Sequence, residues 1–392
     1  MLIETFETTE TDTAIAAQTL AAAATASRAD FVFVTVNAAH GADAFAAALA
    51  GRPRGALHAS TSCLGAMTEE GHLTEAPVSM AALLLTDPDG DFGSAAAPFD
   101  GDPRTAARQA TARALEAARR TGEVPDVVFV TTTPGAEEQA LAGIADLVGP
   151  DTPILGGSAA DNSVAGGWYV SAGDGAHRDG VAVSVLFPST PVSMAYRNGY
   201  VPTDRTGRVT AVDGRCLQAI DGRPARSVYA EWTGSAVTDA DGPVLNILSE
   251  ATLWPLGRRI GDLHGIDTYL LAHPATAEAD GGLTLFADVA EGETLTQMRG
   301  DPDQLADRAG RVAALARPAD GSPVAGALMV YCGGCMLRVR DRMDRVVSGT
   351  REALDGAPFL GFFSFGEQGP ILGEGNRHGN LMISCLVFHR AT

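Results

Sequence analysis

The sequence contains no lysine, and all 28 of its basic side chains are arginine. Without lysine the chain cannot form a Schiff base, and it cannot hold nucleotide phosphates through a P-loop or kinase-type lysine. Aromatic residues are also scarce, at 6% of the chain. The hydrophobic core must therefore be built mainly from valine, leucine, isoleucine and alanine.

Positive charge is in short supply, because 48 acidic residues face 28 basic ones and give a formal net charge of -20. Such a surface repels phosphate backbones and anionic lipid headgroups, so we expect neither nucleic-acid binding nor membrane insertion. The first residues show no basic segment followed by an apolar run, so we also expect no signal peptide. The five cysteines are an odd number, which favours free thiols and a cytoplasmic location.

Three segments of the 392-residue chain share the order strand, helix, strand, strand. They begin with the apolar runs 31–36, 126–131 and 326–331. A strand–helix–strand crossover predicts parallel pairing of its two strands, and the next strand should add antiparallel. The predicted fold class is therefore α/β, with mixed sheets covered by helices.

The predicted helices of the first and third repeats span residues 42–50 and 336–354. Between the second and third repeats, the sequence predicts a meander of short strands with a helix at 225–233. The polar stretch 87–101 is predicted to be a loop, and residues 221–224 are predicted to mark the boundary between two halves.

Polar residues follow the predicted strands, where ligands collect in open sheets. If the repeats surround one crevice, a ligand's ammonium group would meet acidic and amide side chains, and its carboxylate would meet serine hydroxyls. The alternative is turn chemistry, because serine, aspartate and asparagine beside glycine close turns without any ligand. The candidate ligand-binding residues are Asn37, Ser60, Cys63, Ser158, Asp161, Asn162, Cys332, Cys335, Ser364, Glu367, His378 and Asn380.

The segment Cys332-Gly-Gly-Cys335 lies between a predicted strand and a predicted helix. That placement suits a redox dithiol, and it would also supply two soft metal ligands. A tetrahedral zinc site needs two further ligands, and no second C-x-x-C is present. The third interpretation is a tight glycine turn with two inert thiols.

Several motifs, taken together, resemble those of one known protein family. Gly156-Gly-Ser-Ala-Ala-Asp161-Asn162 and Thr61-Ser-Cys63-Leu-Gly65 resemble the N-terminal FIST domain. Cys332 after a strand, Phe365-Gly-Glu367 and His378-Gly-Asn380 resemble the C-terminal FIST domain. The resemblance covers nearly the whole chain and implies a stand-alone protein of two FIST halves, 1–222 and 223–392.

This resemblance implies a sensory role in bacterial signal transduction, with a small polar metabolite such as an amino acid as ligand. The output partner would be a separate polypeptide, such as a histidine kinase, a cyclic-dinucleotide enzyme or a chemotaxis protein. One branch of the family consists of haem proteins that sense nitric oxide, which makes haem b a candidate cofactor. His378, in a glycine-rich loop, is then the candidate haem ligand, and the alternative for it is a loop histidine bonded to backbone.

Three hypotheses follow: a metabolite sensor, a haem-based nitric oxide sensor, and a redox or metal-dependent enzyme using Cys332 and Cys335. The sequence shows no G-x-S-x-G motif, and its histidines and acids are too dispersed to nominate a triad. We therefore expect a binding module rather than an enzyme.

Overall fold

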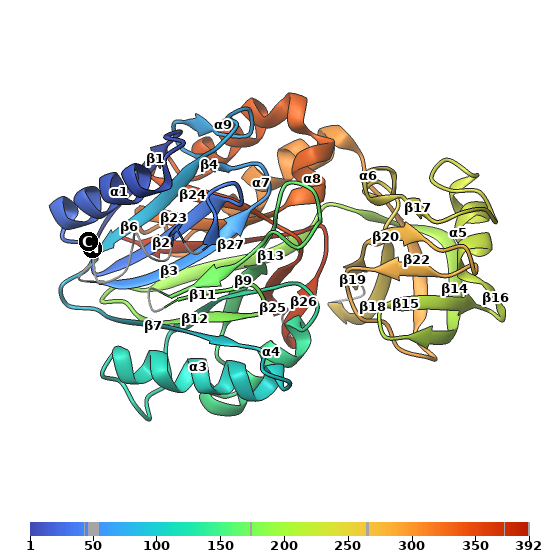
Figure 1. Cartoon of the computed structure of the whole chain (residues 1–392), viewed down its shortest axis with the longest axis horizontal. Helices are drawn as coiled ribbons and strands as arrows, with labels where there is room; N and C mark the ends of the chain where they lie inside the picture. Colours follow the sequence, from blue (N-terminus) through green and yellow to red (C-terminus); the bar gives the residue numbers. More distant parts are fainter. Residues whose placement is uncertain (43, 46–54, 173–174, 264–265, 372, 391–392) are drawn as a thin grey trace.

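The computed structural model describes residues 1–42, 44–45, 55–172, 175–263, 266–371 and 373–390. The chain forms a larger body of sheets covered by helices and a smaller β-rich lobe (Figure 1). The smaller lobe, residues 201–299, is inserted between two elements of the body, so the chain crosses between the lobes twice. Most of the predicted helix 42–50 lies outside the described residues.

The body repeats one pattern three times: an outer strand, a helix, a strand, a crossover, a strand, a short hairpin and a last strand. The first copy is β1 (Leu2–Thr8), α1 (Thr13–Ser27), β2 (Phe31–Asn37), β3 (Ala56–Ser62), β4 (Ala66–Thr68), β5 (Gly71–His72) and β6 (Met80–Thr86). The second is β7 (Asp91–Pro98), α3 (Pro103–Ala117), β8 (Val127–Thr132), α4 (Glu137–Val148), β9 (Ile154–Ser158), β10 (Val170–Ser171), β11 (Ala176–His177) and β12 (Gly180–Phe187). The third is β13 (Val192–Asn198), α7 (Pro302–Ala316), β23 (Val324–Cys332), α8 (Gly333–Arg338), η1 (Arg340–Arg342), α9 (Met343–Ala353), β24 (Phe359–Ser364), β25 (Glu367–Ile371), β26 (Gly375–Gly379) and β27 (Met382–His389).

The predicted pairing within each repeat is confirmed. Strands β2 and β3, β8 and β9, and β23 and β24 are parallel pairs. The last strand of each copy, β6, β12 or β27, is antiparallel to the first strand of that pair. The fold class is α/β with mixed sheets, as the sequence predicted.

The short hairpins are exchanged between the copies in a ring. Hairpin β4–β5 of the first copy adds to β24, hairpin β25–β26 of the third adds to β9, and hairpin β10–β11 of the second adds to β3. Each copy thus completes the sheet of another copy, giving three six-stranded sheets. This exchange holds the ends of β3, β9 and β24 around one axis.

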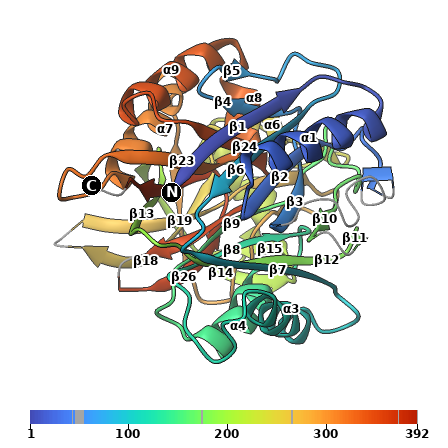
Figure 2. The ribbon, with the colours of Figure 1, turned by 90° about the vertical axis from the view of Figure 1, so that its left-hand side faces the viewer.

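The core of the body lies on this axis, between the three sheets, and the helices occupy three corners outside them (Figure 2). Phe33 of β2 lies 5.0 Å from Phe129 of β8 and 5.2 Å from Phe362 of β24, measured between ring centroids. All three rings are at most 1% exposed. Burial of each ring contributes about 1.5–3 kcal/mol, so the aromatic contacts join the three copies.

The smaller lobe is a nine-stranded sheet with two short helices. Its core residues include Leu217, Tyr229, Leu256 and Leu295. The predicted boundary between residues 222 and 223 falls inside this lobe, in the turn between β15 and β16. The elements are β14 (Val201–Asp213), β15 (Cys216–Ile220), β16 (Arg223–Pro224), α5 (Ala225–Thr233), β17 (Leu245–Asn246), α6 (Leu248–Ala251), β18 (Leu256–Leu263), β19 (Ile266–Ala272), β20 (Pro274–Ala277), β21 (Leu283–Leu285) and β22 (Thr294–Arg299).

Two predictions of local structure were wrong. The predicted loop 87–101 contains strand β7, whose small residues allow α3 to pack closely; a Cβ on Gly93 would lie 2.0 Å from Ala114 O. The predicted helix 336–354 is broken at Val339, which has φ -115° and ψ 23° and is fully buried. Turning the chain there lets Val339 and Met343 both enter the core.

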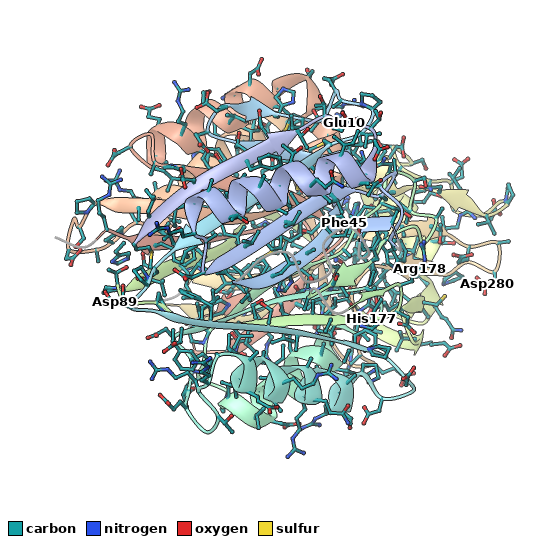
Figure 3. All side chains as sticks on the ribbon, turned by 60° about the vertical axis from the view of Figure 1, so that its left-hand side comes forward. Glu10, Phe45, Asp89, His177, Arg178 and Asp280 are labelled. Carbon is teal, nitrogen blue, oxygen red and sulfur yellow. The ribbon has the colours of Figure 1, made fainter. Side chains whose placement is uncertain are left out.

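No helix among the described residues is long and apolar enough to span a membrane. Acidic side chains are spread over the surface, and Figure 3 shows Glu10, Asp89 and Asp280 on separate outer parts of the molecule. The excess negative charge is therefore distributed over both lobes, so it does not mark any one face as a binding site.

Candidate functional site

The ends of β3, β9 and β24 meet on the axis of the body. The N–H group of Cys63, directly after β3, donates a hydrogen bond to Phe363 O of β24 (3.0 Å). The N–H group of Ser158, at the end of β9, donates to Gly366 O after β24 (2.7 Å). The hairpin exchange thus brings together strand ends that are far apart in the sequence.

Four buried side chains from this region form what we call the strand-end network, completed by an arginine of the smaller lobe. Ser158 Oγ donates to Glu137 Oε1 (2.7 Å), and Gln368 Nε2 lies 3.4 Å from Ser158 Oγ and 3.1 Å from His378 Nδ1. The other ring nitrogen of His378, Nε2, lies 3.4 Å from Phe286 O. Both ring nitrogens of His378 therefore have partners within the protein.

Arg215, in the turn between β14 and β15, completes the network from the smaller lobe. Its Nη2 lies 2.7 Å from Glu137 Oε2 and 3.1 Å from Glu138 Oε2, while its Nε donates to Asp288 Oδ1 (2.7 Å). Burial alone would raise the pKa of Glu137, but the nearby His378 and Arg215 outweigh it and lower that pKa. Glu137 is therefore ionised at neutral pH, and a buried ion pair joins the lobes.

The oxygens of Glu137 and Glu138 and a ring nitrogen of His378 lie within 4.8 Å of one another, close enough to ligate a metal ion. The guanidinium of Arg215 already contacts both carboxylates, however. A metal ion would have to displace this cation and would leave it without its charge partners. The geometry therefore favours an ion-pair network at this position.

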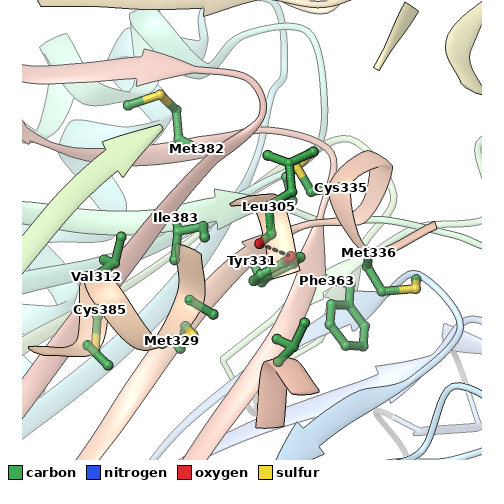
Figure 4. Packing of buried hydrophobic residues seen from close by; sticks show 14 of the residues in the cluster. Leu305, Val312, Met329, Tyr331, Cys335, Met336, Phe363, Met382, Ile383 and Cys385 are labelled. Carbon is green, nitrogen blue, oxygen red and sulfur yellow. Dashed lines mark hydrogen bonds between the residues drawn. The ribbon is translucent and has the colours of Figure 1, made fainter. Parts of the chain in front are cut away.

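The cysteines of the C-x-x-C segment form a second buried group beside this network. Cys332 is the N-cap residue of α8, and Tyr200 Oη lies 3.5 Å from Cys335 Sγ. Ser364 Oγ donates to Glu367 Oε1 (2.6 Å). Burial, together with the neighbouring Cys332, raises the pKa of Glu367 well above its ordinary value. Figure 4 shows Cys335 among buried apolar side chains, close to Leu305.

The remaining predicted residues are bonded within the chain. The Asp161 carboxylate accepts hydrogen bonds from four backbone N–H groups of the following turn. Asn162 accepts from Leu64 N–H (2.8 Å) and donates to Asn37 Oδ1 (3.0 Å). Ser60 donates to a neighbouring carbonyl, and Asn380 accepts from the N–H group of His273. These contacts favour the turn interpretation for Asp161 and Asn162.

A pocket of about 660 Å³, the interlobe pocket, lies where the two lobes join. Its lining includes the first crossing, residues 198–202, and Met298 and Gln304 on either side of the second crossing. Strands β13 and β27, the β18–β19 hairpin, α7 and the end of β25 with the β25–β26 turn supply the rest. A molecule bound here would touch both lobes and both chain segments that connect them.

Three arginines line the interlobe pocket: Arg197, Arg308 and Arg311. Arg308 packs against the first crossing, since a Cβ on Gly199 would lie 3.2 Å from its Cγ. Among the residues that the structure describes, the buried Arg308 Nε has no hydrogen-bond partner. Burial and the charges of Arg311 and Arg197 lower the pKa of Arg308. This guanidinium is thus held near like charges, and no ion pair with an acid is found for it within the described part of the chain.

Three acidic residues line the same pocket: Asp262, Asp267 and Glu374. Asp267 is paired with Arg259 at 2.6 Å, and Glu374 lies 3.3 Å from Arg377. The pocket thus presents both charge signs. The sequence predictions included none of these residues, because each, viewed alone, is an ordinary charge on a strand or a turn.

The chain is thus an α/β protein of two lobes, and its larger body consists of three repeats that exchange hairpins. Comparison of the sequence with known families gives its family. The chain belongs to the FIST family: the FIST N domain matches residues 30–223 and the FIST C domain matches residues 225–370. FIST domains are considered small-molecule sensory domains of signal transduction. The predicted resemblance to this family is confirmed.

A curated relative, an uncharacterized protein of Methanocaldococcus jannaschii, is 28% identical over 179 residues, covering 44% of this chain and 31% of the relative. The match therefore spans about a third of that protein. Among solved structures, the chain is similar to cyanuric acid hydrolase from A. caulinodans, with 10% identity, 99% coverage of both chains and a TM-score of 0.37. PurLQS from Thermotoga maritima gives 9% identity, 76% and 72% coverage, and a TM-score of 0.22. These scores are too low to transfer any property.

Proposed function

We propose that the chain is a sensory module that binds a small zwitterionic metabolite, such as an amino acid, in the interlobe pocket. The observation that carries this proposal is the Arg308 guanidinium, whose buried Nε has no hydrogen-bond partner among the described residues, in a pocket lined by the connection between the lobes. Arginine binds carboxylates through two parallel hydrogen bonds, so a ligand carboxylate is the natural partner of Arg308.

The acidic residues of the pocket support the binding of the ligand's ammonium group. Asp262 lines the pocket, and no ion pair of its side chain is found among the described residues. An ammonium group there would gain a charged partner, while the arginines hold the carboxylate. A volume of about 660 Å³ is ample for such a molecule.

The mechanism follows from where the pocket lies. A ligand that contacts both lobes more favourably in one relative orientation shifts the population toward that orientation. Both sequence halves, 1–222 and 223–392, contribute strands to the smaller lobe. We therefore propose the two lobes, rather than the two sequence halves, as the parts that move.

The partner that reads this change is proposed from the family. A histidine kinase, a cyclic-dinucleotide enzyme or a chemotaxis protein on a separate polypeptide would receive the signal. The cytoplasm is the proposed location, because free thiols suit a reducing compartment. The haem alternative places His378 as the axial ligand, and for this the ring would have to give up Gln368 or Phe286 O.

The test is a thermal-shift and calorimetric screen of the common amino acids. For each binder, the matching amine without a carboxylate and the matching acid without an amine are also measured. We expect amino acids to bind and both truncated analogues to bind more weakly. At a hundredfold excess over Kd, a binder should stabilise the protein by about 2.7 kcal/mol.

Matched variants locate the site. Arg308→Gln should weaken binding about 30-fold or more, because a buried charge pair is lost. Arg351→Gln, on the exposed side of α9 and outside the pocket, should bind as the unchanged protein does. Absence of any amino acid binding, or equal binding by Arg308→Gln, would overturn the proposal.

A further inference from the structure

The C-x-x-C segment has a geometry that the proposed sensory function does not use. Cys332 ends β23 and is the N-cap of α8, and Cys335 is the third residue of that helix. Side chains at the N-cap and at the third helical position lie side by side, as the reciprocal bonds of a capping box show. The two thiols are therefore neighbours, and all five cysteines of the chain are free.

The two thiols are buried, at 4% and 2% exposure. Burial, and the neighbouring Cys335 thiol, raise the pKa of Cys332 well above its ordinary value. The reduced form therefore gains no stability from a Cys332 thiolate. A dithiol whose reduced form is not stabilised in this way favours the disulfide more than one with a low pKa.

Cys335 is also connected to the interlobe pocket. Its Sγ lies 3.5 Å from Tyr200 Oη, and that hydroxyl donates to Thr252 O of the smaller lobe (2.8 Å). Tyr200 belongs to the first crossing and lines the pocket. Any movement of the Cys335 sulfur toward Cys332 therefore changes a contact between the body and the crossing.

We propose that Cys332 and Cys335 form a reversible disulfide with a peroxide as oxidant, and that this bond changes the first crossing through Tyr200. One cysteine loses its proton and its thiolate attacks the peroxide; the O–O bond breaks, a sulfenic acid forms, and the released hydroxide takes up the proton as water. The second thiol attacks the sulfenic sulfur, an S–S bond forms, and a second water leaves. In total, two thiols and one hydrogen peroxide give one disulfide and two waters. The effect on ligand binding rests on the proposed function; the disulfide does not.

The first experiment treats the folded chain with hydrogen peroxide, unfolds it, and counts and maps free thiols. We expect the count to fall from the five of the reduced chain to three, with Cys332 and Cys335 joined in one peptide pair. A dithiol reductant should restore five. In each of the single variants Cys332→Ser and Cys335→Ser the reaction should stop at a sulfenic acid on the remaining cysteine, trapped by a cyclic diketone. Cys385→Ser, which removes a buried thiol on β27, should still form the bond.

Retention of all five thiols, or a disulfide that maps to Cys63 instead, would overturn the disulfide. The connection to Tyr200 has its own readout, which is amide hydrogen exchange of residues 198–202 in oxidised and reduced protein without ligand. We expect faster exchange after oxidation, and unchanged exchange would refute the connection. Loss of two thiols together with a failed amino acid screen would refute the proposed function and leave the disulfide standing.

Discussion

In the strand-end network the buried carboxylate of Glu137 is met by Arg215 and Ser158, whereas in the interlobe pocket Arg308 faces two further arginines. Both regions lie where the lobes meet. In the strand-end network, positive and negative side chains pair with each other. In the interlobe pocket, the Arg308 guanidinium has no acidic partner among the described residues. A buried polar group without a partner is costly and needs an explanation.

This difference favours a structural role for the strand-end network and a ligand-binding role for the interlobe pocket. The strand-end network already holds its charges, so a ligand there would first have to break an ion pair between the lobes. The interlobe pocket gains a partner when a carboxylate enters it. The comparison therefore supports our proposal that Arg215 joins the lobes and that Arg308 binds the ligand, and substitutions test each role separately.

The largest effect should come from Arg215→Ala. It leaves Glu137, 1% exposed, as a buried carboxylate without the guanidinium that lies 2.7 Å from its Oε2. Removing one partner of a buried pair costs about 3–5 kcal/mol, and we expect this loss in the free energy of unfolding measured with urea. The control is Arg223→Ala, whose pair with Glu231 is exposed and should contribute less than about 1 kcal/mol. Equal losses in the two variants would show that the network does not hold the lobes together.

A smaller effect should appear with pH, through His273 at the same junction. Burial lowers the pKa of His273 to about 4 from its ordinary 6.5. Between these values the unfolded chain binds a proton that the folded chain excludes, so stability falls as pH falls from 6.5 to 4. Between pH 7 and pH 5 the loss should be about 2 kcal/mol. Unfolding curves at both pH values measure it, and His273→Gln should lack this part of the pH dependence. An unchanged slope in the variant would show that His273 is not held neutral by the fold.

Much of the body could be predicted from the sequence, because its repeats place apolar strands and glycine turns at a regular spacing. The parallel pairs and the meander followed from that pattern. The exchange of hairpins could not be predicted, since the partner of β4, β10 or β25 belongs to a distant repeat and leaves no local signal. Strand β7 was missed because its alanines and Gly93 resemble a loop until α3 packs on them.

The residues of the candidate sites could likewise be predicted only in part from the sequence. Ser158, Glu367 and the two cysteines could be found, because polar residues at strand ends are visible in the sequence. Arg308 and Arg311 could not, since arginines three apart on a helix normally form a solvated face. Only the folded chain, with Gly199 against Arg308, shows that this face is covered by the crossing.

The smallest change in stability should come from Arg308→Met, and it contrasts most sharply with Arg215→Ala. Methionine keeps the apolar stem and removes an unpaired guanidinium beside two like charges. We expect the free energy of unfolding to stay the same or to rise by up to about 1 kcal/mol, while amino acid binding is lost. Urea unfolding and calorimetry on the same preparation measure both quantities. A fall in stability comparable with that of Arg215→Ala would mean that Arg308 holds the fold, and the pocket would lose its assignment as a ligand site.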